Sequence, residues 1–209
     1  FFLVVLLLLL LVQRVLPFAE IKRRIICQGI LLIASYVFYG WWNMRLCLLL
    51  MGITWISFFT AVKKDEKHLR QSRISLLIGV GTPLAVLGIF KYYDFFVTSF
   101  CDVFHLTPGV LNLILPVGIS FYTFQALSYT IDVYTGKIEK EKSFLQFALY
   151  LSFFPQLVAG PIVKASEFLP QLKENRKVTL AGLESGIQIF VFGMFKKVVL
   201  ADNISVFVD

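Results

Sequence analysis

Long stretches without a charged residue dominate this chain and restrict the folds open to it. Four of them have 20, 17, 17 and 21 residues and cover positions 25–44, 46–62, 74–90 and 143–163. A helix needs about 20 apolar residues to cross the roughly 30 Å hydrocarbon core of a bilayer. Strands of a membrane barrel need alternating apolar and polar residues, and no segment of the sequence shows that alternation. The chain is therefore predicted to be an all-α, polytopic helical membrane protein.

The basic residues gather beside the apolar stretches rather than on a separate polar segment. The chain has 20 Lys and Arg against 13 Asp and Glu, and its densest basic clusters fall at positions 14–24 and 63–73. By the positive-inside rule both clusters are expected in the cytoplasm, which places the visible N-terminus outside. Nucleic acid is not expected as a partner, because it would need a soluble basic face. Aromatic residues typical of a headgroup interface end the first of the four stretches: Tyr36, Tyr39, Trp41 and Trp42.

The stretch at 143–163 contains residues that interrupt a helix. Pro155 and the pair Gly160 and Pro161 lie inside it, and proline removes a backbone donor from a helix. Basic residues precede and follow the stretch, so both of its ends are expected in the cytoplasm. Irregular backbone at membrane depth occurs only where it is buried in protein or lines a cavity. We therefore predict a re-entrant segment here.

Polar side chains recur at helical spacing around the longest uncharged region. Residues 103–131 carry no Asp, Glu, Lys or Arg, yet Tyr122, Gln125, Tyr129 and then Asp132 follow one another at intervals of three, four and three. At about 100° per residue these four side chains fall within an arc of roughly 80° on a helix. The opposite side takes Phe124, Leu127 and Ile131. Such a stripe faces protein or a water-filled path. Both hydrogen bonding between helices and the lining of a path explain it, and the two interpretations remain open.

Few side chains outside this stripe suggest chemistry. The motifs of serine hydrolases, zinc proteases, P-loop proteins and dinucleotide-binding proteins are absent from the sequence. Lys91 and Asp94, near the end of an apolar stretch, either pair with each other at the interface or serve a function. The cysteines and histidines show neither metal-ligand spacing nor the context of a catalytic base: Cys27, Cys47, Cys101, His68 and His105. No metal site is expected.

Two segments resemble the membrane-bound O-acyltransferase (MBOAT) family. Residues 115–136 read LPVGISFYTFQALSYTIDVYTG, and residues 150–172 read YLSFFPQLVAGPIVKASEFLPQL. Two shorter segments, LIASYVFYGWW at 32–42 and IFKYYD at 89–94, add to the resemblance. The likeness covers nearly the whole chain and is strongest to the alginate O-acetyltransferase branch, whose relatives include the D-alanyl transferase of teichoic acid synthesis.

This resemblance implies a membrane-embedded O-acyltransferase of the bacterial cytoplasmic membrane. Such an enzyme moves an acetyl or other acyl group from a cytoplasmic donor through a tunnel. The acceptor is a hydroxyl of an exported polysaccharide, such as alginate or another cell-envelope glycan, or a partner acetyltransferase. Acetyl-CoA is expected as co-substrate, membrane lipids as surroundings, and no bound cofactor. The expected catalytic histidine follows a stretch rich in Trp and Arg that lies beyond Asp209.

The chain is accordingly expected to be a single transmembrane domain, residues 1–209, that forms the N-terminal half of a longer enzyme. No Met precedes residue 1, and residues 1–12 lack the basic flank and cleavage site of a signal peptide. The missing C-terminal half is then a partner of this part. The isolated chain is expected to be inactive.

The residues predicted to line or support the tunnel come from the polar stripe and from the interrupted stretch. They are Tyr122, Gln125, Tyr129, Asp132, Pro155, Gln156, Gly160 and Pro161. A non-enzymatic transporter or flippase for glycan or lipid would use the same features and is the main alternative. A truncated product with only an assembly role is a third interpretation.

Overall fold

The computed structural model describes residues 1–15, 20–65, 68–104, 109, 111, 113–157, 160–174 and 179–205. The chain forms two compact units, Phe1–Glu174 and Asn175–Asp209, which are described separately. Throughout the described residues every regular element is a helix, so the predicted all-α class is confirmed. The assignment of all 209 residues to one domain stays a prediction.

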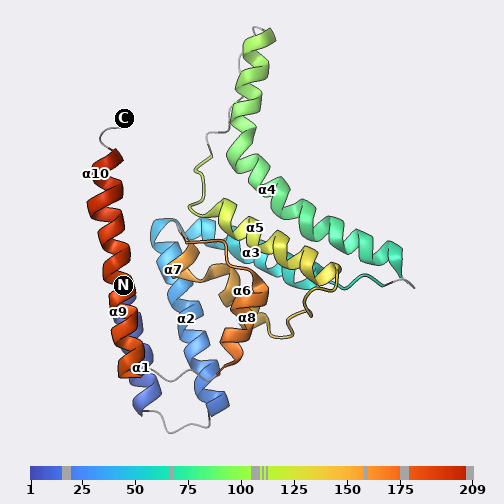
Figure 1. The fold of residues 1–209 in the computed structure, drawn as a ribbon. Helices are drawn as coiled ribbons and strands as arrows, with labels where there is room; N and C mark the ends of the chain where they lie inside the picture. Colours follow the sequence, from blue (N-terminus) through green and yellow to red (C-terminus); the bar gives the residue numbers. More distant parts are fainter. Residues whose placement is uncertain are drawn as a thin grey trace. The chain divides into compact units, whose positions relative to one another are not determined.

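The first unit contains eight helices within its described residues (Figure 1). They are α1 (Phe2–Val15), α2 (Glu20–Trp42), α3 (Met44–Thr60), α4 (Leu69–Phe104), α5 (Ile119–Tyr134), α6 (Phe144–Ser152), α7 (Phe154–Leu157) and α8 (Ala165–Lys173). Two of them, over Glu20–Trp41 and Leu69–Phe104, are long and apolar enough to cross a membrane, whereas α1, α3 and the pair α6 and α7 are apolar but shorter. The predicted helices are present, and several extend further than the uncharged stretches because charged residues are accommodated at helix ends.

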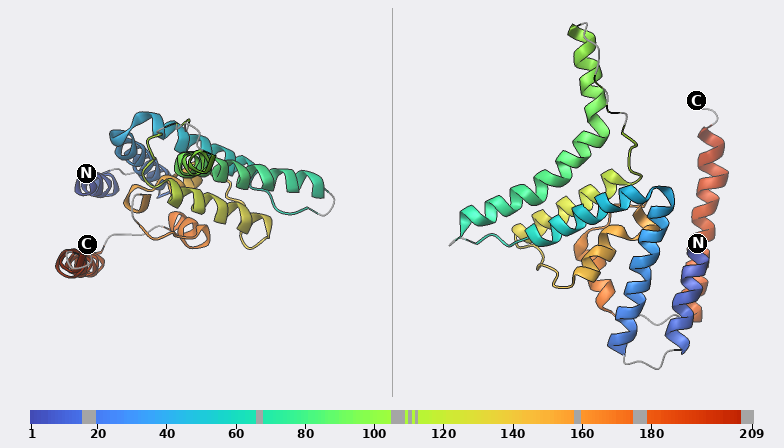
Figure 2. Two further views of the ribbon diagram at one scale, coloured as in Figure 1. Left: turned by 90° about the horizontal axis from the view of Figure 1, so that it is seen from above. Right: turned by 180° about the vertical axis from the view of Figure 1, so that it is seen from behind.

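Helices α3, α4 and α5 pack against one another, and α2 packs against α3 and α6 (Figures 1 and 2). The shared core between these groups includes Leu50 and Ile53 of α3, Tyr122 and Tyr129 of α5, and Phe147 of α6. The rings of Tyr129 and Phe147 have centroids 4.5 Å apart. Aromatic side chains therefore fill the space where the two groups of helices meet.

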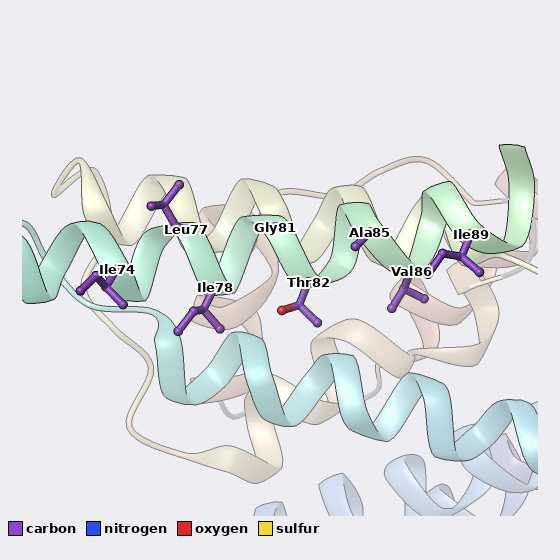
Figure 3. Close-up of a pocket in the computed structure, with 8 residues that line it drawn as sticks. All are labelled: Ile74, Leu77, Ile78, Gly81, Thr82, Ala85, Val86 and Ile89. Atoms are coloured by element: carbon purple, nitrogen blue, oxygen red, sulfur yellow. The ribbon is translucent and has the colours of Figure 1, made fainter. Parts of the chain in front are cut away.

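Helix α4 has 36 residues, a length of about 54 Å at 1.5 Å per residue. It contains Pro83 and changes direction along its length (Figure 1). One face carries a shallow pocket of about 430 Å³, in which Gly81, Thr82 and Ala85 are flanked by larger aliphatic residues (Figure 3). The hydroxyl of Thr82 is the one side-chain polar group labelled there, so this pocket offers little for catalysis.

The interrupted stretch is confirmed as a break between helices. Helix α6 ends at Ser152, and Phe153 turns the chain with φ −57° and ψ 105°. Pro155 is the second residue of the four-residue helix α7, a position where its missing N–H removes no helical hydrogen bond. The break therefore begins at Phe153, ahead of the predicted proline.

An ion pair joins a residue just before this stretch to the last residue of α8. The carboxylate of Glu141, only 5% exposed, lies 2.7 Å from Nζ of Lys173. Its Oε1 also accepts the N–H groups of Lys142 at 2.9 Å and Ser143 at 3.0 Å. Contact between residues before and after the stretch is the geometry that a re-entrant segment requires.

Helix α2 contacts the same end of α8. Gln28 Nε2 donates to the carbonyl oxygen of Leu172 at 2.7 Å, and the guanidinium of Arg24 donates to the carbonyl oxygen of Lys173. Gln146 Nε2 of α6 reaches Oε1 of Gln28 at 3.5 Å. We call the set Arg24, Gln28, Glu141, Gln146 and Lys173 the polar junction. It holds the end of α8 against α2, α6 and the loop before α6.

The second unit is a continuous helical run over its described residues. Helix α9 (Leu180–Phe195) begins at Thr179, whose Oγ1 accepts the N–H of Gly182 at 3.1 Å. It continues into the π-helical turn η1 (Lys196–Ala201) and then α10 (Asp202–Ser205). Lys196 lies over the ring of Phe192, 4.5 Å from its centroid. The helical run continues through the two adjacent lysines at 196 and 197.

Gly118 is predicted to be essential for the close packing of the start of α5 against Leu157. Its φ is +75°, and a Cβ there would collide with the carbonyl oxygen of Leu157. We expect Gly118→Ala to destabilise the protein by more than the roughly 1–2 kcal/mol of a left-handed conformation alone. Gly136→Ala is the matched control, because its φ is +76° but its Cβ would meet only the flexible end of Lys63. Thermal unfolding in detergent measures both, and equal losses would contradict the proposed collision.

Glu141 is predicted to make stability depend on pH. Burial favours its neutral form, but hydrogen bonds from Lys173, Ser143 and Lys142 outweigh burial and hold the pKa of Glu141 below its usual range. A lowered pKa contributes stability above the unfolded pKa of about 4.3, and this contribution is lost as pH falls through the folded pKa. We expect Glu141→Gln to cost about 2 kcal/mol at neutral pH, with a smaller cost in acid.

Thermal unfolding of Glu141→Gln and the parent protein from pH 7 down to about pH 2 measures this effect, because the contribution is lost below the unfolded pKa of about 4.3. The exposed Glu139 in the same loop provides the control variant Glu139→Gln, which should follow the parent protein at each pH. An offset between Glu141→Gln and the parent that stays constant across this range would contradict the assignment.

Candidate functional site

The polar face of α5 points into the protein. Gln125 is 3% exposed and Tyr122 and Tyr129 are fully buried, whereas Phe124 on the other side is 46% exposed. Three of the four residues of this face are thus buried within the protein. Leu127 was predicted on the side opposite the polar residues, but it is buried too. Fewer residues of α5 therefore face outward than the sequence indicates.

Asp132 lies apart from these three side chains. It occupies the last turn of α5, where its Oδ1 is 3.5 Å from Nζ of Lys137. Ser128 Oγ donates to its Oδ2 at 3.4 Å. These contacts lie at the helix end beside the α5–α6 loop, so Asp132 pairs locally while the others enter the core.

Tyr129 connects the polar face to the polar junction. Its Oη accepts the backbone N–H of Glu141 at 2.9 Å. The same loop residue carries the buried carboxylate that pairs with Lys173. A displacement of the junction would therefore be transmitted directly to Tyr129.

The interrupted segment contributes one side chain to the interior. Gln156 is buried, and its Nε2 donates to the carbonyl oxygen of Tyr150 at 3.2 Å. Tyr150 Oη in turn donates to the carbonyl oxygen of Val163 at 3.1 Å. These bonds satisfy one carbonyl in the last turn of α6 and one beyond α7, as buried polar groups require.

The other predicted residues of the segment lie nearer the surface. Pro155 and Pro161 are exposed, and Gly160 is half-buried. A Cβ on Gly160 would lie 2.5 Å from Cα of Gln156. Gly160 thus allows a close backbone approach, while the prolines shape the chain from outside.

Several buried hydroxyls lack a hydrogen-bond partner within the described part of the chain. They belong to Tyr39 of α2, Ser57 of α3, and Tyr122 and Thr123 of α5. The phenols of Tyr39 and Tyr122 are close enough to interact electrostatically, yet they form no hydrogen bond of normal geometry. Buried polar groups are normally hydrogen-bonded, so these hydroxyls are exceptions within the described part of the chain.

The sequence did not reveal Tyr39 or the polar junction. Tyr39 was expected in an interfacial aromatic cluster, but it is buried in the core, whereas Trp41 is 90% exposed. Tyr39 lies two residues from Trp41 along α2 and so points to a different side of the helix. For Glu141 the one available signal was its place just before Ser143, the N-cap of α6, where a carboxylate is favoured.

The described residues offer no arrangement for metal or acid–base chemistry. No group of three or more His, Cys, Asp or Glu among them is placed to hold a metal ion. His68 lies in the loop before α4, where its Nδ1 is 3.1 Å from the exposed Asp65 carboxylate. His105 lies outside the described residues. The arrangement can donate hydrogen bonds and exclude water, but the described residues include no buried histidine.

Comparison with known proteins shows which family this chain resembles. The sequence profile of MBOAT, the membrane-bound O-acyltransferase family, matches residues 138–209. A probable alginate O-acetylase AlgI from Pseudomonas putida is 38% identical over 86% of this chain and 38% of its own length. The peptidoglycan O-acetyltransferase of Helicobacter pylori is 37% identical over 86% of this chain and 39% of its own length.

A teichoic acid D-alanyltransferase from Streptococcus thermophilus is 30% identical over 44% of this chain and 23% of its own length. No solved structure gives a significant match. The chain thus spans about two fifths of the length of the first two relatives, 38% and 39%. The profile match, the similarity along 86% of the chain and the all-helical structure together identify the chain as a member of the membrane-bound O-acyltransferase family, similar to its alginate O-acetylases.

Proposed function

We propose that this chain forms part of a membrane-embedded O-acyltransferase of the bacterial cytoplasmic membrane. The enzyme transfers an acetyl or other acyl group from a cytoplasmic donor, such as acetyl-CoA, to hydroxyls of an exported cell-envelope polysaccharide. The observation that carries this proposal is the buried polar face of α5, formed by Tyr122, Gln125 and Tyr129. The relatives named alginate O-acetylase and peptidoglycan O-acetyltransferase support the reaction class.

The α5 face supplies the donors that acyl transfer requires. Attack of a hydroxyl on an acyl carbonyl develops negative charge on oxygen, and preorganised donors in a water-poor site stabilise that charge. The Tyr122 hydroxyl forms no hydrogen bond of normal geometry among the described residues and interacts only with the Tyr39 phenol, so a substrate oxygen could accept from it. Gln125 lies one turn further along the same helix face. We assign both to the wall of the acyl path.

The base for the reaction is assigned to a residue outside the described part of the chain. Acylation of a hydroxyl needs a base to accept its proton, most often a histidine. His68 is exposed in a loop beside Asp65, so it is not placed to act as this base. The α5 face and the interrupted segment then position substrate and support a histidine from elsewhere in the enzyme.

The polar junction supports a cytoplasmic position for both ends of the interrupted segment. Basic residues flank the segment on each side, and Glu141 and Lys173 are in contact. Under the positive-inside rule this geometry favours a re-entrant segment that enters from the cytoplasm and returns there. In the same proposed topology the visible N-terminus lies outside the cell. The acyl donor then approaches from the cytoplasm, on the side of the polar junction.

A transporter or flippase would use a similar buried polar face. The relatives reported above are named as transferases rather than transporters, so transfer is the function we propose. The acceptor is either an exported glycan or a partner acetyltransferase that passes the acyl group on.

Gln125 provides a direct test of the path wall. We expect Gln125→Leu to lower acetyl transfer by about tenfold or more, because it removes a donor from the acyl path, while expression and thermal stability stay near those of the parent. Gln171→Leu is the matched control, because Gln171 is exposed on α8. Acetylated polysaccharide produced per unit of membrane protein measures the effect. Unchanged transfer in Gln125→Leu would remove the residue from the path.

Asp132 provides a second, separable test. Its partner Lys137 lies at the helix end, so we expect Asp132→Ala to lower transfer less than Gln125→Leu and to lower the thermal midpoint more. Kinetics and thermal unfolding of both variants in one membrane preparation measure the contrast. A loss of transfer in Asp132→Ala at unchanged stability would instead place Asp132 on the path.

The histidine of the described residues should not take part in catalysis. We expect His68→Ala to retain full acetyl transfer, because His68 lies in an exposed loop with Asp65. We also expect the 209-residue chain by itself to show no turnover with acetyl-CoA, because none of its described residues is a buried histidine. Turnover by this chain that His68→Ala abolishes would contradict both expectations.

A further inference from the structure

A large surface groove of the first unit lies between α2, α3 and the start of α6. Its volume is about 1210 Å³, and its lining includes Tyr36, Trp41, Leu48, Met51, Gly52 and Trp55. Most of these side chains are open to the surroundings, as shown by the 90% exposure of Trp41. In a membrane protein such a groove is a place where a hydrocarbon chain or another helix can lie.

One end of the groove carries positive charge. Arg45 lines the groove and is its single charged residue among those the structure describes. It lies in the first turn of α3, where the helix dipole already favours an anion over a cation. Asn43 caps this helix through its side chain, which accepts the N–H of Arg45 at 3.0 Å. The remaining lining is apolar or aromatic, so charge is confined to the end beside the α2–α3 turn.

The length of the groove matches one leaflet of a bilayer. Along α3 the lining extends from Met44 to Ile56, about 18 Å at 1.5 Å per residue. Half of a hydrocarbon core is about 15 Å thick. Trp41 at the charged end is the residue type that prefers the headgroup level. An apolar channel of leaflet length with a cation at its headgroup end complements the shape and charge of a phospholipid.

We propose that this groove binds a phospholipid, with an acyl chain along α2 and α3 and the headgroup phosphate on Arg45. A lipid with net negative charge should be preferred, because it carries no cation that competes with Arg45 for the phosphate. The proposal does not depend on acyl transfer. It assigns to this face a bound lipid rather than a second copy of the chain.

Tryptophan fluorescence can test the proposal, because Trp41 and Trp55 both line the groove. The protein is reconstituted in vesicles that contain phosphatidylglycerol and phosphatidylcholine, with either one or the other lipid brominated at equal mole fraction. Bromine quenches a tryptophan that it touches. A double variant, Trp41→Phe with Trp55→Phe, gives the signal of all other tryptophans for subtraction.

We expect brominated phosphatidylglycerol to quench the groove signal about twofold to fivefold more than brominated phosphatidylcholine, consistent with one basic residue near the lipid surface. Arg45→Gln should reduce this ratio to one. Arg70→Gln, which changes an exposed arginine at the start of α4, should leave the ratio unchanged. Equal quenching by the two lipids in the parent protein would overturn the preference, and quenching by neither would show that protein covers the groove.

A second pair of variants tests the shape of the site. Gly52 lines the groove, and a Cβ at this position would meet nothing within 4 Å. Gly52→Leu should therefore fill the groove without a clash and remove the excess quenching by phosphatidylglycerol. Gly29→Leu is the control, because Gly29 is equally uncrowded on α2 but lies outside the groove lining. Loss of the excess in Gly29→Leu, or its retention in Gly52→Leu, would contradict the assigned site.

Discussion

The structure depends on one constraint of the membrane interior, where water is not available to hydrogen-bond polar groups. A helix that carries Tyr122, Gln125 and Tyr129 on one face must bury that face in protein, and α5 does so against the aromatic core shared with α3 and α6. The break after Ser152 obeys the same rule, because Gln156 donates to a carbonyl in the last turn of α6 and Tyr150 donates to the carbonyl of Val163, beyond α7. Both features belong to the first unit.

The features that were predictable from the sequence are those with a local cause. Uncharged stretches predicted the helices, the spacing from Tyr122 to Tyr129 predicted a shared face, and the prolines predicted a break. The pairing of Glu141 with Lys173 has no local signal, because 32 positions separate the two residues and folding alone brings them together. Tyr39 was misplaced for a related reason. Its neighbours in sequence are interfacial aromatics, and composition does not show which side of α2 it occupies.

The polar junction explains how the interrupted segment after Ser152 is held in place. Side chains of α2 hold the carbonyl end of α8, Glu141 holds Lys173, and Tyr129 accepts the N–H of Glu141. Through these bonds the interrupted segment, the loop before it and the α5 face form one connected set. In a membrane-bound O-acyltransferase this connection would fix the wall of the acyl path relative to its cytoplasmic end.

Reactivity of a single cysteine at position 125 tests the central claim that the α5 face lines an acyl path rather than only packs. In a background without the native thiols of Cys27, Cys47 and Cys101, Gln125→Cys should react with a small water-soluble thiol reagent, and acyl donor should slow the reaction. Phe124→Cys on the outward face should react at a rate that donor does not change. A cysteine at position 125 that stays unreactive with and without donor would contradict the account and identify the polar face as packing alone.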